Sequence, residues 1–247
     1  MKDNVFIKES ERVDDLHRNG YLIIQDPKNF CFGVDAVLLS GFASVKKGEK
    51  VIDLGTGTGV IPILMEGRYG GESYYGIDIQ EESVEMAQRS IKLNSLENKI
   101  KISLCDIKEV FNKFECSSFD VVTSNPPYMN TGGGIINEYS PKAVARHEIL
   151  CDLDDVVYAA AKLLKFGGRF YMIHRPHRLV DIFYVLRKHK IEPKVIRFIH
   201  PYFDRDPSMV LIESSRGGKS MLKVLPPLVI YEKNGEYTEE IYKIYYK

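Results

Sequence analysis

The sequence predicts an α/β fold with a mixed, seven-stranded sheet, and three observations support this fold class. Segments typical of buried strands alternate with amphipathic helices through the middle of the chain. The first of these strands leads into a glycine-rich turn at residues 55–59. The last two strands are too close in sequence for a crossover helix to join them. These patterns indicate parallel strands, covered by helices on both faces, that end in an antiparallel pair.

The elements follow a regular order from residue 49 onward. The predicted parallel strands are residues 49–54, 73–78, 99–106, 119–124 and 169–174. The predicted helices are residues 60–69, 81–94 and 152–165, followed by a helix that runs through Leu186. Gly167 and Gly168 mark the end of the third helix, because glycine commonly stops a helix at its carboxyl end.

Two further strands, residues 194–200 and 209–214, complete the sheet. The eight residues between them include Pro201 and Pro207 and leave no room for a helix, so we expect an antiparallel hairpin. We expect one domain over residues 1–247. Residues 46–216 would form its core, residues 1–45 an N-terminal extension of unassigned fold, and residues 217–247 an extended C-terminal addition.

Composition places the chain among ordinary globular proteins and excludes several classes. Apolar residues make up 44% of the 247 residues and charged residues 28%, which excludes fibrous and wholly disordered chains. No apolar run approaches the roughly 18 residues of a membrane-spanning helix, and the N-terminus lacks the apolar run of a signal peptide. The four cysteines are widely spaced, which argues against a zinc site or a disulfide framework and indicates a reducing cytoplasm.

The run Asp53-Leu-Gly-Thr-Gly-Thr-Gly59 lies at a junction from strand to helix. Glycines there let the backbone approach a ligand closely and adopt positive φ. A turn of this kind binds the polar part of a nucleotide-like ligand at the carboxyl end of a strand. No Lys-Ser/Thr pair follows, so the turn is not a phosphate loop. Asp53, Gly55, Gly57 and Gly59 are therefore candidate cofactor-binding residues.

Carboxylates also end the next two predicted strands. Asp78, 25 residues after Asp53, can accept hydrogen bonds from both hydroxyls of a ribose, and Ile79 follows it at the same edge. Asp106 ends the third strand, where it could accept from an adenine amino group or cap a short helix. A series of strand-end carboxylates favours the cofactor interpretation.

The tetrapeptide Asn125-Pro-Pro-Tyr128 directly follows the fourth strand. Two prolines fix the backbone and remove two N–H donors, so the local polar groups are mainly acceptors. The Asn125 carboxamide oxygen and the Pro126 carbonyl can both accept from an NH2 group held between them, and Tyr128 offers a flat face for stacking. This arrangement suits an exocyclic or amide nitrogen whose lone pair is aimed at an electrophile.

These motifs, in this order, look like the class I S-adenosylmethionine-dependent methyltransferases, which have a Rossmann-like fold. Asn-Pro-Pro-Tyr resembles the subgroup that methylates planar nitrogens: adenine N6, guanine N2 and glutamine side chains. The resemblance implies S-adenosylmethionine as cofactor, held by Asp53, the turn glycines, Asp78, Ile79, Asp106 and Asn125. It also implies that Asn125 and Pro126 hold the target amine and that Tyr128 stacks on the target base.

A narrower resemblance covers nearly the whole chain. The segments that carry it include residues 20–25, 32–39, 145–148, 174–179, 191–197 and 226–228. They look like the bacterial methyltransferases that modify an adenine N6 of valine tRNA beside the anticodon, at position 37. The resemblance implies a tRNA partner and no metal, and places Phe32 and Asp35 over the methionine end of the cofactor. Asp35 could equally cap a helix and Phe32 could simply be buried.

Charge is unevenly distributed along a chain whose formal net charge is zero. Residues 162–223 carry 14 basic and 5 acidic residues, a net charge of +9. Such an excess suits RNA phosphates, although a solvated surface explains it equally well. Arg178 and Arg197 lie in this stretch and are candidate RNA contacts; Arg146 follows a loop, residues 130–140, that could close over a substrate.

Three alternatives remain beside adenine-N6 methylation of tRNA. A protein glutamine N5-methyltransferase and an rRNA guanine-N2 methyltransferase would share the tetrapeptide. A methyltransferase-like module that only binds RNA would need neither the glycine turn nor Asn125-Pro-Pro-Tyr128. The oligomeric state cannot be inferred from the sequence.

Overall fold

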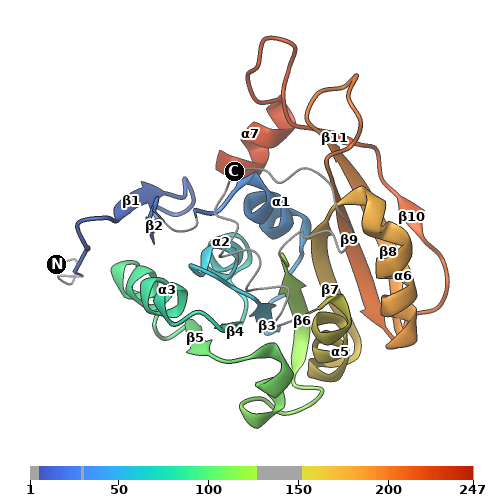
Figure 1. The fold of residues 1–247 in the computed structure, drawn as a ribbon, viewed down its shortest axis with the longest axis horizontal. Coiled ribbons are helices and arrows are strands. Elements are labelled where there is room, and N and C mark those ends of the chain that lie inside the picture. The colour runs from blue at the N-terminus through green and yellow to red at the C-terminus, as the bar shows by residue number, and fades with distance from the viewer. Residues whose placement is uncertain (1–5, 29–30, 127–151, 247) are drawn as a thin grey trace.

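The parallel strands predicted from residue 49 onward form the centre of one twisted sheet in a computed structural model, which describes residues 6–28, 31–126 and 152–246 (Figure 1). Seven of its strands lie side by side in the order β8-β9-β7-β6-β3-β4-β5. Its strands are β3 (Lys50–Leu54), β4 (Ser73–Asp78), β5 (Ile100–Leu104), β6 (Phe119–Ser124), β7 (Leu164–His174), β8 (Ile191–His200) and β9 (Met209–Arg216). Strand β9 is antiparallel to both β7 and β8, which confirms the mixed sheet and the terminal hairpin.

The sheet has nine strands in the described part of the chain, not seven. The additional strands are β10 (Lys223–Val224) and β11 (Leu228–Val229), and both pair in parallel with the outer edge of β8. Each is two residues long, too short to give a periodic pattern in the sequence. By pairing with β8 they cover a strand edge that would otherwise be open to association.

Helices cover both faces of the sheet, as alternation along the strands requires. Val51 and Val121 point into one apolar cluster with α1 (Val34–Phe42), α2 (Val60–Tyr69) and α3 (Glu81–Leu93). Ile52 and Val122 point into the other cluster with α5 (Leu153–Leu163) and α6 (Leu179–Lys188). Adjacent residues of one strand therefore bury opposite faces, as in a sheet covered on both sides.

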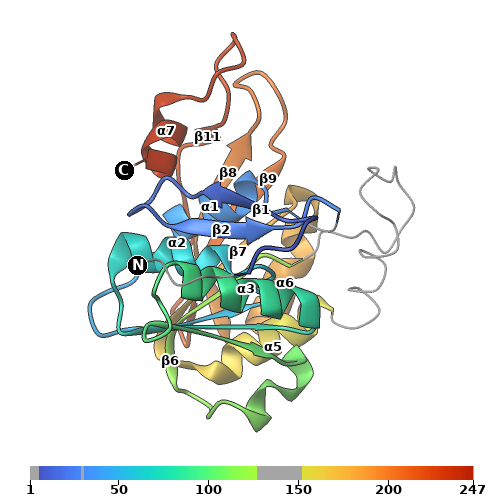
Figure 2. The same cartoon turned by 90° about the vertical axis from the view of Figure 1, so that its left-hand side faces the viewer.

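The N-terminal extension forms a hairpin and a helix. Strands β1 (Arg12–Asp15) and β2 (Leu22–Gln25) pair antiparallel, and β2 contacts α3, as Figure 2 shows. Arg89 of α3 ties this hairpin down, because its Nη2 lies 2.6 Å from Oε1 of Glu11, whose side chain is only 1% exposed. The pKa of Glu11 is accordingly lowered, chiefly by its hydrogen bond to Arg89.

The sequence predicts an extended C-terminal addition, and this prediction is wrong in part. The addition ends in a helix, α7 (Glu239–Tyr246). Ile241 of this helix is buried, and Ile244 and Tyr245 pack against the cluster that contains α1. The spacing of these three residues is that of one helix face. Tyr237 stacks on Tyr245 with ring centroids 5.5 Å apart.

The glycines at 167–168 do not end a helix. Helix α5 starts after Asp152, whose side chain accepts from the N–H of Asp155 at 2.9 Å, and it stops at Leu163. Gly167, with φ of 78°, lies inside β7, where the pairing with β6 shifts register. The glycine pair therefore accommodates a bulge at the start of the strand.

No described helix is both long and apolar enough to span a bilayer. Within the same residues, His, Cys, Asp and Glu side chains form no group of three or more that could hold a metal ion.

Candidate active site

Parallel pairing brings the carboxyl ends of β6, β3, β4 and β5 to one edge of the sheet. Asp53 of β3 pairs in register with Thr123 of β6, and Asp78 ends β4 opposite Leu104 of β5. Asn125 follows the last residue of β6. The predicted residues Asp53, Asp78 and Asn125 therefore gather at the edge where open α/β sheets bind their ligands.

The glycine turn is held across the end of β4. The N–H groups of Gly55 and Thr56 both donate to the carbonyl of Ile77, at 3.0 and 2.9 Å. Gly55 and Gly57 have φ of 74° and 54°, which only glycine adopts without strain. A Cβ added at either position would meet no atom within 4 Å. The turn thus presents bare backbone to open space, as a ligand cradle requires.

Asp78 is fixed by two backbone donors. Its Oδ2 accepts from the N–H of Gly57 at 2.8 Å, and its Oδ1 accepts from the N–H of Gln80 at 2.9 Å. Both hydrogen bonds are charge-assisted, so they hold the carboxylate in one orientation at the strand end. Each oxygen retains a further lone pair, which suits a pair of vicinal hydroxyls.

Asp53 is a buried carboxylate with an unsatisfied oxygen. Its Oδ1 accepts from the hydroxyl of Thr123 at 2.6 Å. Its Oδ2 and the neighbouring Thr56 Oγ1 have no hydrogen-bond partner among the described residues. Burial raises the pKa of Asp53 to about 6, the nearby hydroxyl groups of Thr123 and Thr56 oppose that rise, and the Asp78 carboxylate adds to it. Such an oxygen fits the ammonium group at the methionine end of S-adenosylmethionine.

Replacing Asp53 with asparagine should make the cofactor-free protein more stable at neutral pH. A folded-state pKa above the unfolded value means that folding favours the protonated acid. The wild type therefore loses stability as pH rises from about 4 through about 6. The difference between a pKa of about 4 in the unfolded chain and about 6 in the folded chain corresponds to roughly 3 kcal/mol of stability. Urea unfolding at several pH values should show that the extra stability of Asp53→Asn over the wild type grows across this pH range. A difference in stability that is constant with pH would contradict the raised pKa of Asp53.

Asn125 is oriented by a residue far away in sequence. Its carboxamide Nδ2 donates to Oδ2 of Asp35 at 3.0 Å, and Asp35 lies in the first turn of α1. The amide nitrogen is thereby directed to Asp35, so the acceptor end of the carboxamide points the other way. Asp35 is not the N-cap of α1, because Gly33 occupies that position.

The remaining cofactor candidates also lie near this edge. Ile79 is 38% exposed directly after Asp78, so its side chain offers an apolar surface to a ligand. Asp106 is the N-cap of a 3-10 turn, Ile107–Asn112, and its carboxylate accepts from the N–H of Lys108 at 2.9 Å. The capping interpretation of Asp106 is therefore confirmed, and a contact with adenine remains a prediction. Phe32 packs partly buried against the core beside α1.

The two arginine candidates for RNA binding differ in their surroundings. Arg178 precedes α6, near the carboxyl end of β7, and its Nε lies 2.9 Å from Oδ2 of Asp181. Arg197, in β8, donates to the carbonyl of Pro226 and forms an ion pair with Glu240 at 2.7 Å. Arg197 thus holds the C-terminal segment against the sheet, which makes Arg178 the stronger candidate. Tyr128 and Arg146 lie outside the described residues.

Sequence reasoning did not identify three polar side chains at this edge: Thr56 in the glycine turn, Thr123 in β6 and His174 at the end of β7. A threonine in a glycine turn or a buried strand carries no signal until its hydrogen-bond partner is known. His174 ends β7 and is only 5% exposed. Burial, aided by the nearby charge of Arg178, lowers the pKa of His174 to about 4, so the imidazole is neutral at physiological pH.

A family model described as a methyltransferase domain matches residues 45–190. The chain therefore belongs to this methyltransferase family. A solved structure titled as a predicted O-methyltransferase from Agrobacterium tumefaciens superposes with a TM-score of 0.70 at 20% identity, over 85% of this chain and 94% of the other. The fold is that of the class I enzymes, whose methyl donor is S-adenosylmethionine.

Two similar curated relatives bear a more specific name. The tRNA1(Val) (adenine(37)-N6)-methyltransferase of Phocaeicola vulgatus is 28% identical over 180 residues, 73% of this chain and 74% of the relative. The protein of the same name from Histophilus somni is 28% identical over 224 residues, 88% of this chain and 89% of the relative.

Proposed function

We propose that this chain transfers a methyl group from S-adenosylmethionine to the N6 of an adenine in tRNA, beside the anticodon. The relatives named above carry this activity in their names. The observation that carries the proposal within the chain is the carboxamide of Asn125, which Asp35 orients at the edge that holds the glycine turn.

The glycine turn, Asp53 and Asp78 would hold the cofactor. Open space over Gly55 and Gly57 accommodates it, the unsatisfied Oδ2 of Asp53 would accept from its ammonium group, and Asp78 would accept from the ribose hydroxyls. Ile79 and Asp106 would border the adenine. When bound, the cofactor would supply a sulfonium methyl group to an amine nitrogen that attacks it in line, with the neutral thioether as leaving group.

The contribution of the protein is mainly orientation. Asn125, with its NH2 directed to Asp35, would accept a hydrogen bond from the adenine N6, and the carbonyl of Pro126 would accept the second. Both bonds would turn the N6 lone pair toward the methyl group, and the amine would lose one proton to solvent after transfer. Positioning of this kind can supply about 7–11 kcal/mol of barrier reduction. Tyr128 would stack on the target base, and Phe32 would lie over the methionine end.

An RNA substrate also agrees with the charge distribution. The target base must leave its stack, and this costs less in a loop than in a duplex. Arg178, Arg146 and Arg197 are the arginines we assign to RNA contact, with Arg178 best placed. A tRNA substrate implies that the chain works in the cytoplasm.

Transfer of a labelled methyl group separates the candidate functions. Purified protein and labelled cofactor should label a tRNA pool. They should not label ribosomal RNA or a protein carrying a methyl-accepting glutamine. Label in protein alone would favour the glutamine N5 alternative, and label in rRNA alone would favour the guanine-N2 alternative. RNA binding without any methyl transfer would favour the non-catalytic module.

A further inference from the structure

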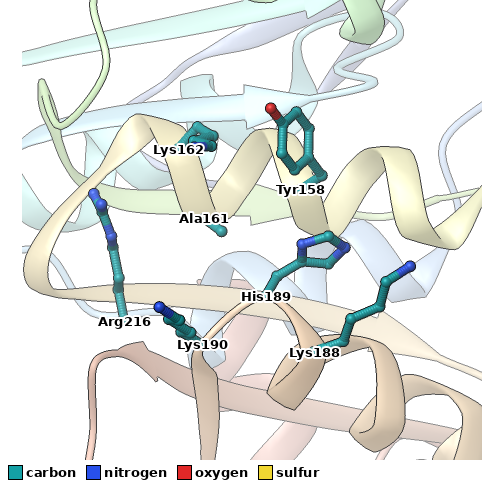
Figure 3. Close-up of a pocket in the computed structure, with 7 residues that line it drawn as sticks. All are labelled: Tyr158, Ala161, Lys162, Lys188, His189, Lys190 and Arg216. Carbon is teal, nitrogen blue, oxygen red and sulfur yellow. The ribbon is translucent and has the colours of Figure 1, made fainter.

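A pocket of about 300 Å³ opens between α5, the turn from α6 to β8, and the end of β9 (Figure 3). Most of its lining side chains carry nitrogen. Those that matter for its chemistry are Tyr158, Lys162, Lys188, His189, Lys190 and Arg216. They come from three parts of the chain separated by more than twenty residues each, so the pocket is a product of the fold.

The pocket lies at the opposite edge of the sheet from the active site. Arg216 pairs with Ile191 at the start of β8, and its Nη1 donates to the hydroxyl of Ser117 at 2.8 Å. Ser117 precedes β6, whereas Asn125 follows it. Six residues of β-strand span about 20 Å, so a ligand of the pocket is separate from the cofactor and the target base.

The positive charge of the pocket is only partly neutralised. Lys188 and His189 share one carboxylate oxygen of Asp154, at 2.7 and 3.1 Å. Among the described residues, no carboxylate lies within ion-pair distance of Lys162, Lys190 or Arg216. Four permanent cations thus face one carboxylate.

Neighbouring groups fix the arrangement of these cations. The guanidinium of Arg216 also donates to the carbonyl of Leu164, which anchors it at the base of β7. The ammonium of Lys162 lies 5.6 Å from the ring centre of Tyr158, and that ring meets His189 edge to face. The cations lie close together, are held in place, and offer hydrogen-bond donors from several sides of the pocket. Such a pocket suits an anion with several acceptor oxygens.

We propose that this pocket binds a backbone phosphate of the tRNA, about 20 Å from the adenine that is methylated. The inference rests on the proposed function, and it assigns a second contact to the same substrate. This separation is the length of several base pairs along an A-form RNA stem. A stem that leads away from the active-site edge can therefore cross the sheet and reach the pocket, where Lys162, Lys190 and Arg216 bind one of its phosphates.

Charge reversal of two exposed lysines tests this second contact. Lys162→Glu, Lys190→Glu and the double variant remove pocket cations without touching the active site. Lys233→Glu is the matched control, because Lys233 is also exposed but lies in a turn outside the pocket. The double variant should raise KM for tRNA by about tenfold with kcat unchanged, as loss of uniform binding does. The slope of log affinity against log salt should become shallower by about one for each lost phosphate contact.

Equal tRNA affinity in the double variant and in Lys233→Glu would overturn the proposal, as would a loss confined to kcat. A pocket that serves an acidic polypeptide instead would also leave tRNA affinity unchanged. Fluorescence anisotropy with labelled tRNA measures the affinity without turnover. Failure of the wild type to methylate tRNA would therefore refute the proposed function, while the comparison of variants would still decide whether the pocket binds RNA.

Discussion

Asn125→Ala should slow methyl transfer to tRNA by about 10²–10³ while leaving the affinity for S-adenosylmethionine nearly unchanged. Loss of one well-placed polar contact to a reacting group typically costs roughly 2.7–4 kcal/mol of transition-state stabilisation. Single-turnover rates and calorimetric cofactor binding separate the two effects. Wild-type rates in this variant would mean that the carboxamide does not orient the target amine.

Asp35 supplies a finer test of the same geometry. Asp35→Asn keeps the size of the side chain but removes the carboxylate that receives the Asn125 NH2 group. The side-chain amide of Asn125 can then rotate so that its NH2 group and its oxygen exchange places. We therefore expect a lower kcat with little change in the KM for tRNA. Asp35→Glu, which restores the carboxylate, should recover part of the rate. If both variants lose the same activity, Asp35 acts by stabilising α1 rather than by positioning Asn125.

Gly57→Ala should lower the affinity for S-adenosylmethionine by about ten- to a hundredfold, the equivalent of roughly 1–3 kcal/mol of overpacking. The added methyl group would project into the open space that we assign to the cofactor, from a residue with φ of 54°. Isothermal calorimetry gives the affinity, and thermal unfolding gives the accompanying strain.

Gly48→Ala is the matched control for Gly57→Ala. Gly48 has φ of 83° and likewise has no atom within 4 Å of an added Cβ, but it precedes β3 at the other end of the strand. Both variants should lose about 1–2 kcal/mol of stability from left-handed backbone strain. Only Gly57→Ala should lose cofactor binding. Equal cofactor affinity in the two variants would place the cofactor elsewhere.

The strands of the sheet and the hairpin at its end could be predicted because they depend on local patterns. Buried strands such as residues 119–124 are apolar runs bounded by turns, and the eight residues after His200 exclude a crossover helix. Short pairings escaped prediction. Strands β10 and β11 form only because β8 offers an open edge, which no pattern within residues 217–229 reveals. The bulge at Gly167 resembles a helix stop in the sequence, because glycine is common at both kinds of position.

The candidate site was predicted at the level of strand ends but not at the level of contacts. Parallel strands necessarily bring Asp53, Asp78 and Asn125 to one edge, so their grouping follows from the order of elements. The bond between Asn125 and Asp35 joins residues 90 positions apart, and the unsatisfied Oδ2 of Asp53 depends on which hydroxyls surround it. Contacts of this range follow from the fold rather than from any local motif.

Nucleoside mass analysis of tRNA treated with the enzyme tests the central claim most directly. Wild-type protein and S-adenosylmethionine should convert adenosine to N6-methyladenosine in tRNA, and fragment mapping should place the product beside the anticodon. Asn125→Ala, with cofactor affinity intact, should yield almost none in the same time. Methylguanosine as the only product, or equal yields of N6-methyladenosine from wild type and Asn125→Ala, would contradict the account.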